Sequence, residues 1–163
     1  VTGVQTCALP ICAGDAKIGS IVGGSARDGE RLKTRFLKST PALQRLRDTV
    51  STYAAKGYVP GLDGRKIWVR SDHAALNSLL QGAGAVVMKK ALVILNKNLR
   101  KAGVEYKFVA NVHDEWQIET KKEHANIVGE LAVEAIREAG RVYDLFCPLD
   151  GEYKIGNNWK ETH

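Results

Sequence analysis

The hydrophobic positions of residues 14–57 recur at helical spacing and predict three short helices. A glycine pair separates the first helix from the second, and Ser25 is placed to cap the second. Thr40 and Pro41 occupy the cap and the first position of the third helix, which Gly57 is placed to end. The apolar positions that carry this pattern are, in chain order, Ile18, Ile21, Val22, Leu32, Phe36, Leu37, Leu43, Leu46, Val50 and Tyr53.

A hairpin and one long helix are predicted next. The Asp63-Gly64 dipeptide lies between two apolar runs, residues 58–60 and 66–69, which is typical of a β-hairpin. Apolar residues at helical spacing then continue from 72 to 101 and predict the longest helix of the chain. Gly82 and Gly84 interrupt this face, where they would permit a kink or the close approach of a backbone or ligand.

The pattern changes to alternation after residue 105. Every second position from Tyr106 to Val112 is apolar, and the alternation resumes at Trp116 beyond an acidic turn, so two antiparallel strands are predicted. A helix over about residues 122–139 and a last short strand over residues 148–155 are expected to follow. The layout therefore predicts an α+β fold with helices in front and an antiparallel sheet behind.

The overall composition fits a globular domain with one core. The 163 residues are 44% hydrophobic and 26% charged, which excludes intrinsic disorder and a collagen-like repeat. No run of about 18 uncharged apolar residues is present, so we expect no membrane span. The three cysteines, Cys7, Cys12 and Cys147, form no C-x-x-C pair and have no neighbouring histidine. Neither a disulfide framework nor a zinc site is indicated, and a reducing, cytoplasmic setting is expected.

Positive charge is concentrated in the first part of the chain. The formal net charge is +6, and residues 1–70 hold 12 Lys and Arg against 5 Asp and Glu. Within this part, residues 27–47 carry seven basic side chains against two acidic ones, a density that suits phosphate groups. A solvated helix face explains the same charge run equally well.

An acidic turn, His113-Asp114-Glu115, interrupts the apolar alternation. Charged groups are costly in a sheet core, so this pair of carboxylates either lies in solvent or binds a cation. Neighbours on a strand point to opposite faces, so only one of them could be a direct ligand unless the turn re-aims them. A hard ion such as Mg²⁺, held by one or two carboxylates plus substrate phosphates, suits this sparse donor set better than zinc. An ordinary exposed hairpin tip is the alternative.

A polar stripe opens the long helix. His73, Asn77 and Gln81 recur at four-residue steps and share one face, and Arg65 and Arg70 precede them. Asn and Gln donate and accept at once, which suits base edges or sugars, while a helix start with nearby arginines suits phosphate. A polar face that meets only water would show the same pattern.

Four ordered blocks, read together, resemble the family A DNA polymerases. The long helix is more similar to the phage replicative branch than to the bacterial repair branch. The resemblance covers about residues 13–163. Four blocks in the same order are a specific signal of the family, whereas any single block would be a weak one. The blocks are GLDGR at 61–65, HAALNSLLQGAGA at 73–85, VHDE at 112–115 and GNNWKETH at 156–163.

The resemblance implies a helical fingers portion over residues 13–57, followed by the C-terminal palm portion over 58–163. The palm portion would be part of an antiparallel sheet with packed helices. By similarity, Asp114 matches the family's second catalytic metal-binding aspartate and Glu115 the acidic residue beside it. His113 matches the histidine near the primer terminus. By similarity, Asn77 and Gln81 touch the minor groove of the template-primer, Arg65 falls in a segment that approaches the duplex backbone, and His73 stands where many relatives have Arg. Together with Arg70, which precedes the long helix, the expected DNA-binding residues are Arg65, Arg70, His73, Asn77 and Gln81.

The implied reaction is template-directed phosphoryl transfer in DNA replication. A primer 3′-hydroxyl attacks the α-phosphate of a deoxynucleoside triphosphate, and two Mg²⁺ ions stabilise the attacking and leaving oxygens. The implied partners are primer-template DNA and deoxynucleoside triphosphates, with no membrane, in a bacterial cytoplasm if the protein is phage-encoded. Nothing in the sequence identifies a processivity factor.

The chain is expected to be an incomplete piece of such an enzyme. The family's first metal-binding aspartate and its nucleotide-binding helix precede the region covered by the resemblance, and nothing in this chain matches them. Residues 1–12, VTGVQTCALPIC, look like a non-native leader. We therefore expect the chain to be inactive by itself. The alternative is a free-standing basic DNA-binding module without catalysis.

Overall fold

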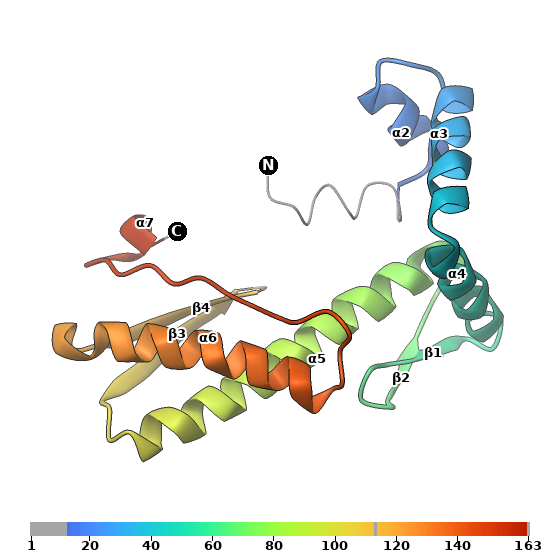
Figure 1. Cartoon of the computed structure of the whole chain (residues 1–163). Helices are drawn as coiled ribbons and strands as arrows, with labels where there is room; N and C mark the ends of the chain where they lie inside the picture. The colour runs from blue at the N-terminus through green and yellow to red at the C-terminus, as the bar shows by residue number, and fades with distance from the viewer. Residues whose placement is uncertain (1–12, 113, 163) are drawn as a thin grey trace. The chain divides into compact units, whose positions relative to one another are not determined.

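The computed structural model describes residues 13–112 and 114–162, without the side chains of Asp72 and His73, and most of this region is helical (Figure 1). The expected leader and His113 lie outside the described residues. The helices are α2 (Asp15–Ile21), α3 (Ala26–Ser39), α4 (Pro41–Ala54), α5 (Asp72–Lys101), the short 3₁₀ helix η1 (Lys122–His124), α6 (Ala125–Val142) and α7 (Trp159–Thr162). The strands are β1 (Tyr58–Pro60), β2 (Lys66–Trp68), β3 (Tyr106–Val112) and β4 (Glu115–Thr120).

The strands form two antiparallel hairpins, β1–β2 and β3–β4, so the expected α+β class is confirmed. The chain divides into two compact units that meet between Gln81 and Gly82, inside α5. The boundary between fingers and palm portions that the resemblance implies near residue 57 stays a prediction.

Two glycines let α2 and α3 approach each other in the first unit. A Cβ on Gly29 would lie 1.9 Å from the carbonyl oxygen of Asp15, and one on Gly19 would lie 2.1 Å from that of Ser25. Ser25 caps α3 as predicted, because its Oγ accepts from the Asp28 backbone N–H while the Asp28 carboxylate accepts from the Ser25 N–H. The sequence pattern thus located the start of α3 but gave no sign of the contact between the two helices.

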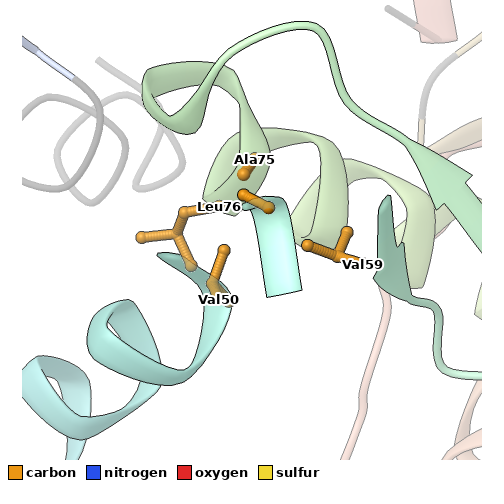
Figure 2. Close-up of a cluster of buried hydrophobic side chains, with 5 residues drawn as sticks. Val50, Val59, Ala75 and Leu76 are labelled. Atoms are coloured by element: carbon orange, nitrogen blue, oxygen red, sulfur yellow. The ribbon is translucent and has the colours of Figure 1, made fainter. Parts of the chain in front are cut away.

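The remainder of the first unit shares a hydrophobic core, shown in Figure 2. Its buried members come from the end of α4, from β1 and from the first turns of α5. They are Val50, Ala54, Val59, Ala75 and Leu76. Thr40 precedes Pro41 as predicted, but its side chain makes no cap bond and instead donates to the carbonyl of Phe36, 2.9 Å away. The β1–β2 turn contains Gly64 at φ +80°, a conformation that favours glycine and confirms the predicted hairpin.

The second unit contains the rest of α5, the β3–β4 hairpin and α6. Buried side chains of α5 include Leu95 and Leu99, and those of α6 include Val128 and Ala139. The Tyr106 hydroxyl at the start of β3 donates to Asn96 Oδ1, at 2.5 Å, and so ties the hairpin to α5. The helix expected over 122–139 is present as α6, which follows the 3₁₀ turn η1 and extends to Val142.

The last predicted strand is wrong. Residues 148–155 form no strand, and their side chains are instead held by α6. The Tyr153 ring covers Gly129, where an added Cβ would lie 2.3 Å from the ring, and Asp150 accepts from Arg137. An alternating pattern creates an extended segment, but a strand also needs a ladder partner, and here side-chain contacts with a helix take its place.

Helix α5 is continuous from Asp72 to Lys101, so neither glycine ends it. Its residues Ala74–Lys101 have a mean hydropathy of 1.5 and are long and apolar enough to cross a membrane by length and composition alone. This property is weak evidence, because the core helix of a soluble protein shares it. The expectation of no membrane span stays a prediction.

Candidate functional site

The two carboxylates of the acidic turn lie at the tip of the β3–β4 hairpin. Val112 pairs with Glu115, so only residues 113 and 114 connect the strands. Such a two-residue connection is the tightest common hairpin and holds its residues at the sheet end. Asp114 is exposed and Glu115 is half-buried at the first position of β4. The predicted acidic turn is therefore present, with its two carboxylates in different surroundings.

A hydrogen bond from Gln117 orients the Glu115 carboxylate, and Gln117 is itself bonded by a second element. The Gln117 side-chain amide donates to Glu115 Oε1, since residues two apart on β4 share a face. The Gln117 carbonyl oxygen in turn accepts from the Thr162 hydroxyl of α7, at 3.2 Å. Sequence reasoning missed both Gln117 and Thr162. The i, i+2 spacing from Glu115 would have indicated Gln117, but no local pattern links it to Thr162.

The predicted DNA-binding residues lie in the first unit, on the β1–β2 turn and the start of α5. Arg65 follows the turn and donates to Asp63 Oδ2 through Nε at 2.6 Å, while its side chain remains 74% exposed. This bond is the largest cause of a lowered pKa of the Asp63 carboxyl. Arg70 is exposed just before α5.

Asn77 and Gln81 are exposed one helical turn apart on α5, so the structure brings these two amides onto one face. The side chain of His73, one turn earlier, lies outside the described residues. The predicted polar stripe is thus present at its two described positions, Asn77 and Gln81.

The donor set at the hairpin tip suits part of a magnesium site. Asp114 and Glu115 offer only carboxylate oxygens, which are the ligands that hard divalent cations prefer. A Mg²⁺ ion that also binds waters or phosphate oxygens needs only one or two carboxylates from the protein. Within residues 13–112 and 114–162 no three His, Cys, Asp or Glu side chains gather closely enough to hold a metal. The pair therefore fits a cation whose remaining ligands come from elsewhere.

Comparison with known proteins gives the class of protein. The family model "DNA polymerase family A" matches residues 12–161, and the chain belongs to this family. The expected family, on the phage side, is thereby confirmed.

Its relatives include phage enzymes. The chain is 43% identical to the DNA-directed DNA polymerase of Escherichia phage Phieco32, covering 93% of this chain and 26% of that protein. It is 39% identical to the DNA-directed DNA polymerase of Escherichia phage T7, with 93% and 25% covered. The chain thus spans about a quarter of the length of these relatives.

A solved structure supports the fold. The chain resembles the structure titled "POL domain of Pol1 from M. smegmatis complex with DNA primer-template and dNTP", with a TM-score of 0.72 over 83% of this chain and 26% of that one. The sequence identity is 19%, so this likeness concerns the fold alone.

Proposed function

We propose that the chain is the part of a template-directed DNA polymerase that carries one carboxylate pair of the catalytic metal site, in an enzyme that extends a primer 3′ end during DNA replication. The observation that carries the proposal is the acidic pair at the tip of a tight hairpin, in a chain that belongs to DNA polymerase family A.

Asp114 and Glu115 are the proposed metal ligands of this chain. Bound Mg²⁺ would supply charge stabilisation for the attacking and leaving oxygens of a phosphoryl transfer. The chain's own contribution is to present two adjacent carboxylates at the end of the β3–β4 hairpin, with Glu115 oriented by the Gln117 amide. His113, between Val112 and Asp114, is proposed to lie near the primer terminus.

The exposed polar residues of the first unit are the proposed DNA contacts. Asn77 and Gln81 are one turn apart and carry amides that suit the acceptors of the minor groove. Arg65 and Arg70 are exposed cations that suit phosphate oxygens. His73, four residues before Asn77 in the sequence, is the remaining proposed contact. The structural relative was solved with primer-template and dNTP, which supports the same partners here.

We further propose that the chain alone does not catalyse. A two-metal clamp takes carboxylates from separate places, and the described residues contribute one adjacent pair. The full enzyme would obtain the remaining ligands and the nucleotide-binding groups from the three quarters of its relatives that this chain does not cover.

A chimera tests the proposal. Residues 13–163 would replace the matching stretch of the Phieco32 polymerase, and primer extension with Mg²⁺ would be measured. We expect activity in the chimera, a loss of at least about 100-fold in the Asp114→Asn chimera, and none from the chain alone. Asp144→Asn is the matched control, because Asp144 is an exposed carboxylate in the same unit, away from the hairpin tip in sequence.

Two results would contradict the proposal. A folded chimera that binds DNA but never extends the primer would favour the free-standing binding module. Mg²⁺-dependent extension by the chain alone, abolished in Asp114→Ala, would show that the chain holds a complete site.

A further inference from the structure

One face of α3 carries four exposed cations in a row. Arg27, Arg31, Arg35 and Lys38 follow one another at steps of four, four and three residues, which places them along one side of the helix over about three turns. Together with Glu30 and Thr34 they line a shallow depression on the helix surface. These four side chains are called the basic face of α3.

The opposite side of α3 is the one that packs. Gly29 lies against the backbone of Asp15, and Lys33 donates to the Asp15 carboxylate at 3.2 Å and to the Ala13 carbonyl at 3.3 Å. Lys33 is thus the one cation of α3 with an internal structural partner on α2. The basic face contributes nothing to this packing.

Little negative charge compensates the basic face. Arg31 reaches Asp28 at 3.4 Å, but its side chain is 81% exposed and such a pair stabilises weakly. Asp28 is already engaged by the cap of α3. Between residues 13 and 162, with 113 set aside, Arg27, Arg35 and Lys38 take part in no ion pair. A row of like charges repels itself, and a polyanion would relieve that repulsion.

We infer that the basic face of α3 binds the phosphate backbone of DNA, at a site separate in the sequence from the stripe at 65–81. Base stacking needs an aromatic side chain, and the only one in α3, Phe36, lies on the opposite side, half-buried. Four cations spaced one per turn along the helix suit a row of phosphate oxygens.

We choose DNA over an acidic protein segment as the binding partner, because the chain belongs to a family of DNA polymerases. The inference rests on the proposed function in this respect, but it concerns residues that the metal chemistry does not use.

Salt dependence of DNA binding tests the inference in the full chain. The variant Arg27→Gln, Arg31→Gln, Arg35→Gln, Lys38→Gln keeps good helix formers at exposed positions, and circular dichroism checks its helix content. The control variant Lys97→Gln, Arg100→Gln, Lys101→Gln, Lys122→Gln removes the same charge from exposed positions of the second unit. Each protein is titrated with a primer-template that has a template overhang.

We expect the plot of log affinity against log salt to be flatter by about 3 in the α3 variant and unchanged in the control. Between about 50 and 200 mM salt the wild-type chain would then lose roughly 50- to 150-fold more affinity than the α3 variant. Scrambling the DNA sequence should leave both numbers unchanged.

Three results would overturn the inference. The α3 variant could keep the wild-type slope, both variants could flatten it equally, or polyglutamate could bind the basic face more tightly than DNA of equal charge. None of these results would contradict the proposed function, which is tested separately by primer extension with the chimera. A wild-type chain that binds no DNA even at low salt would also overturn the inference, while the chimera would still test the proposed function.

Discussion

Asp114 and Glu115 are adjacent residues with different physical surroundings. Asp114 is exposed on the hairpin turn, whereas Glu115 is half-buried and accepts a hydrogen bond from the Gln117 amide. A carboxylate held by a neutral donor keeps its orientation without losing its charge, which suits a ligand that must already be in place when the metal arrives. The two residues should therefore differ in how far they depend on their neighbours.

Replacing Gln117 tests this dependence. In the chimera, Gln117→Leu removes the donor to Glu115 at similar side-chain size, and we expect kcat to fall by about 10- to 100-fold with a higher Mg²⁺ concentration at half-saturation. Affinity for primer-template should stay the same, because Gln117 is not one of the proposed DNA contacts. Glu119→Gln is the matched control, since Glu119 lies two residues further on β4 and pairs only with Lys107 at the surface. An unchanged Mg²⁺ requirement in Gln117→Leu would refute an orienting role.

The site could be predicted from sequence only where its signal was local. Two carboxylates within an apolar alternation identified Asp114 and Glu115 as unusual, and the i, i+4 spacing identified Asn77 and Gln81 as neighbours. The hydrogen bond from Thr162 to Gln117 joins residues 45 positions apart. Such a pairing depends on how the C-terminal segment returns to the hairpin, and no periodic pattern in the sequence predicts this path.

At the scale of the elements, helix glycines have two opposite roles. Gly29 in α3 has no room for a side chain because the Asp15 carbonyl lies where a Cβ would be, whereas a Cβ on Gly84 in α5 would meet nothing within 4 Å. The first glycine serves the contact between helices, while the second only weakens its own helix.

Alanine substitutions at the two positions should have opposite effects on stability. Gly29→Ala forces α2 and α3 apart and should cost about 1–3 kcal/mol, while Gly84→Ala should gain about 0.5–1 kcal/mol from better helix propensity. Since two units need not unfold together, amide hydrogen exchange in α3 and in α5 is the suitable measurement. A stabilised α3 in Gly29→Ala would mean that the two helices do not pack as described.

Most helices and strands could be predicted, because short-range sequence signals determine where they begin and end. Pro41 indicated the start of α4, although Thr40 does not cap it, and Asp63-Gly64 indicated the β1–β2 turn. The strand expected over 148–155 failed because its alternation reports only an extended backbone. In the folded chain Tyr153 and Asp150 contact α6, so the segment is held by side chains and not by a ladder.

At the scale of the whole molecule, charge separates along the sequence. The basic excess and the proposed DNA contacts belong to residues before 82, and the acidic hairpin belongs to those after it. Among the described residues, six carboxyls across both units, some exposed and some half-buried, have a lowered pKa, each because a nearby donor stabilises the ionised form. The donor that contributes most is Ser25 for Asp28, Arg65 for Asp63, Lys121 for Glu105, Arg141 for Glu134, the Gly151 N–H for Asp150 and the Asn157 N–H for Glu161.

These shifts predict that the chain loses stability in acid. A carboxyl whose pKa is lower in the folded state stabilises the fold above its unfolded value, and that contribution disappears as the pH falls through the folded value. The ordinary values are 3.8 for Asp and 4.5 for Glu, so Tm should be nearly constant down to about pH 5 and then decline. The double variant Asp28→Asn, Glu161→Gln removes two of these carboxyls. It should melt below the wild type at neutral pH and approach it as the pH falls through the lowered pKa values of the folded wild type, where these groups become protonated. A constant gap between the two melting curves at every pH would show that the loss comes from something other than ionisation.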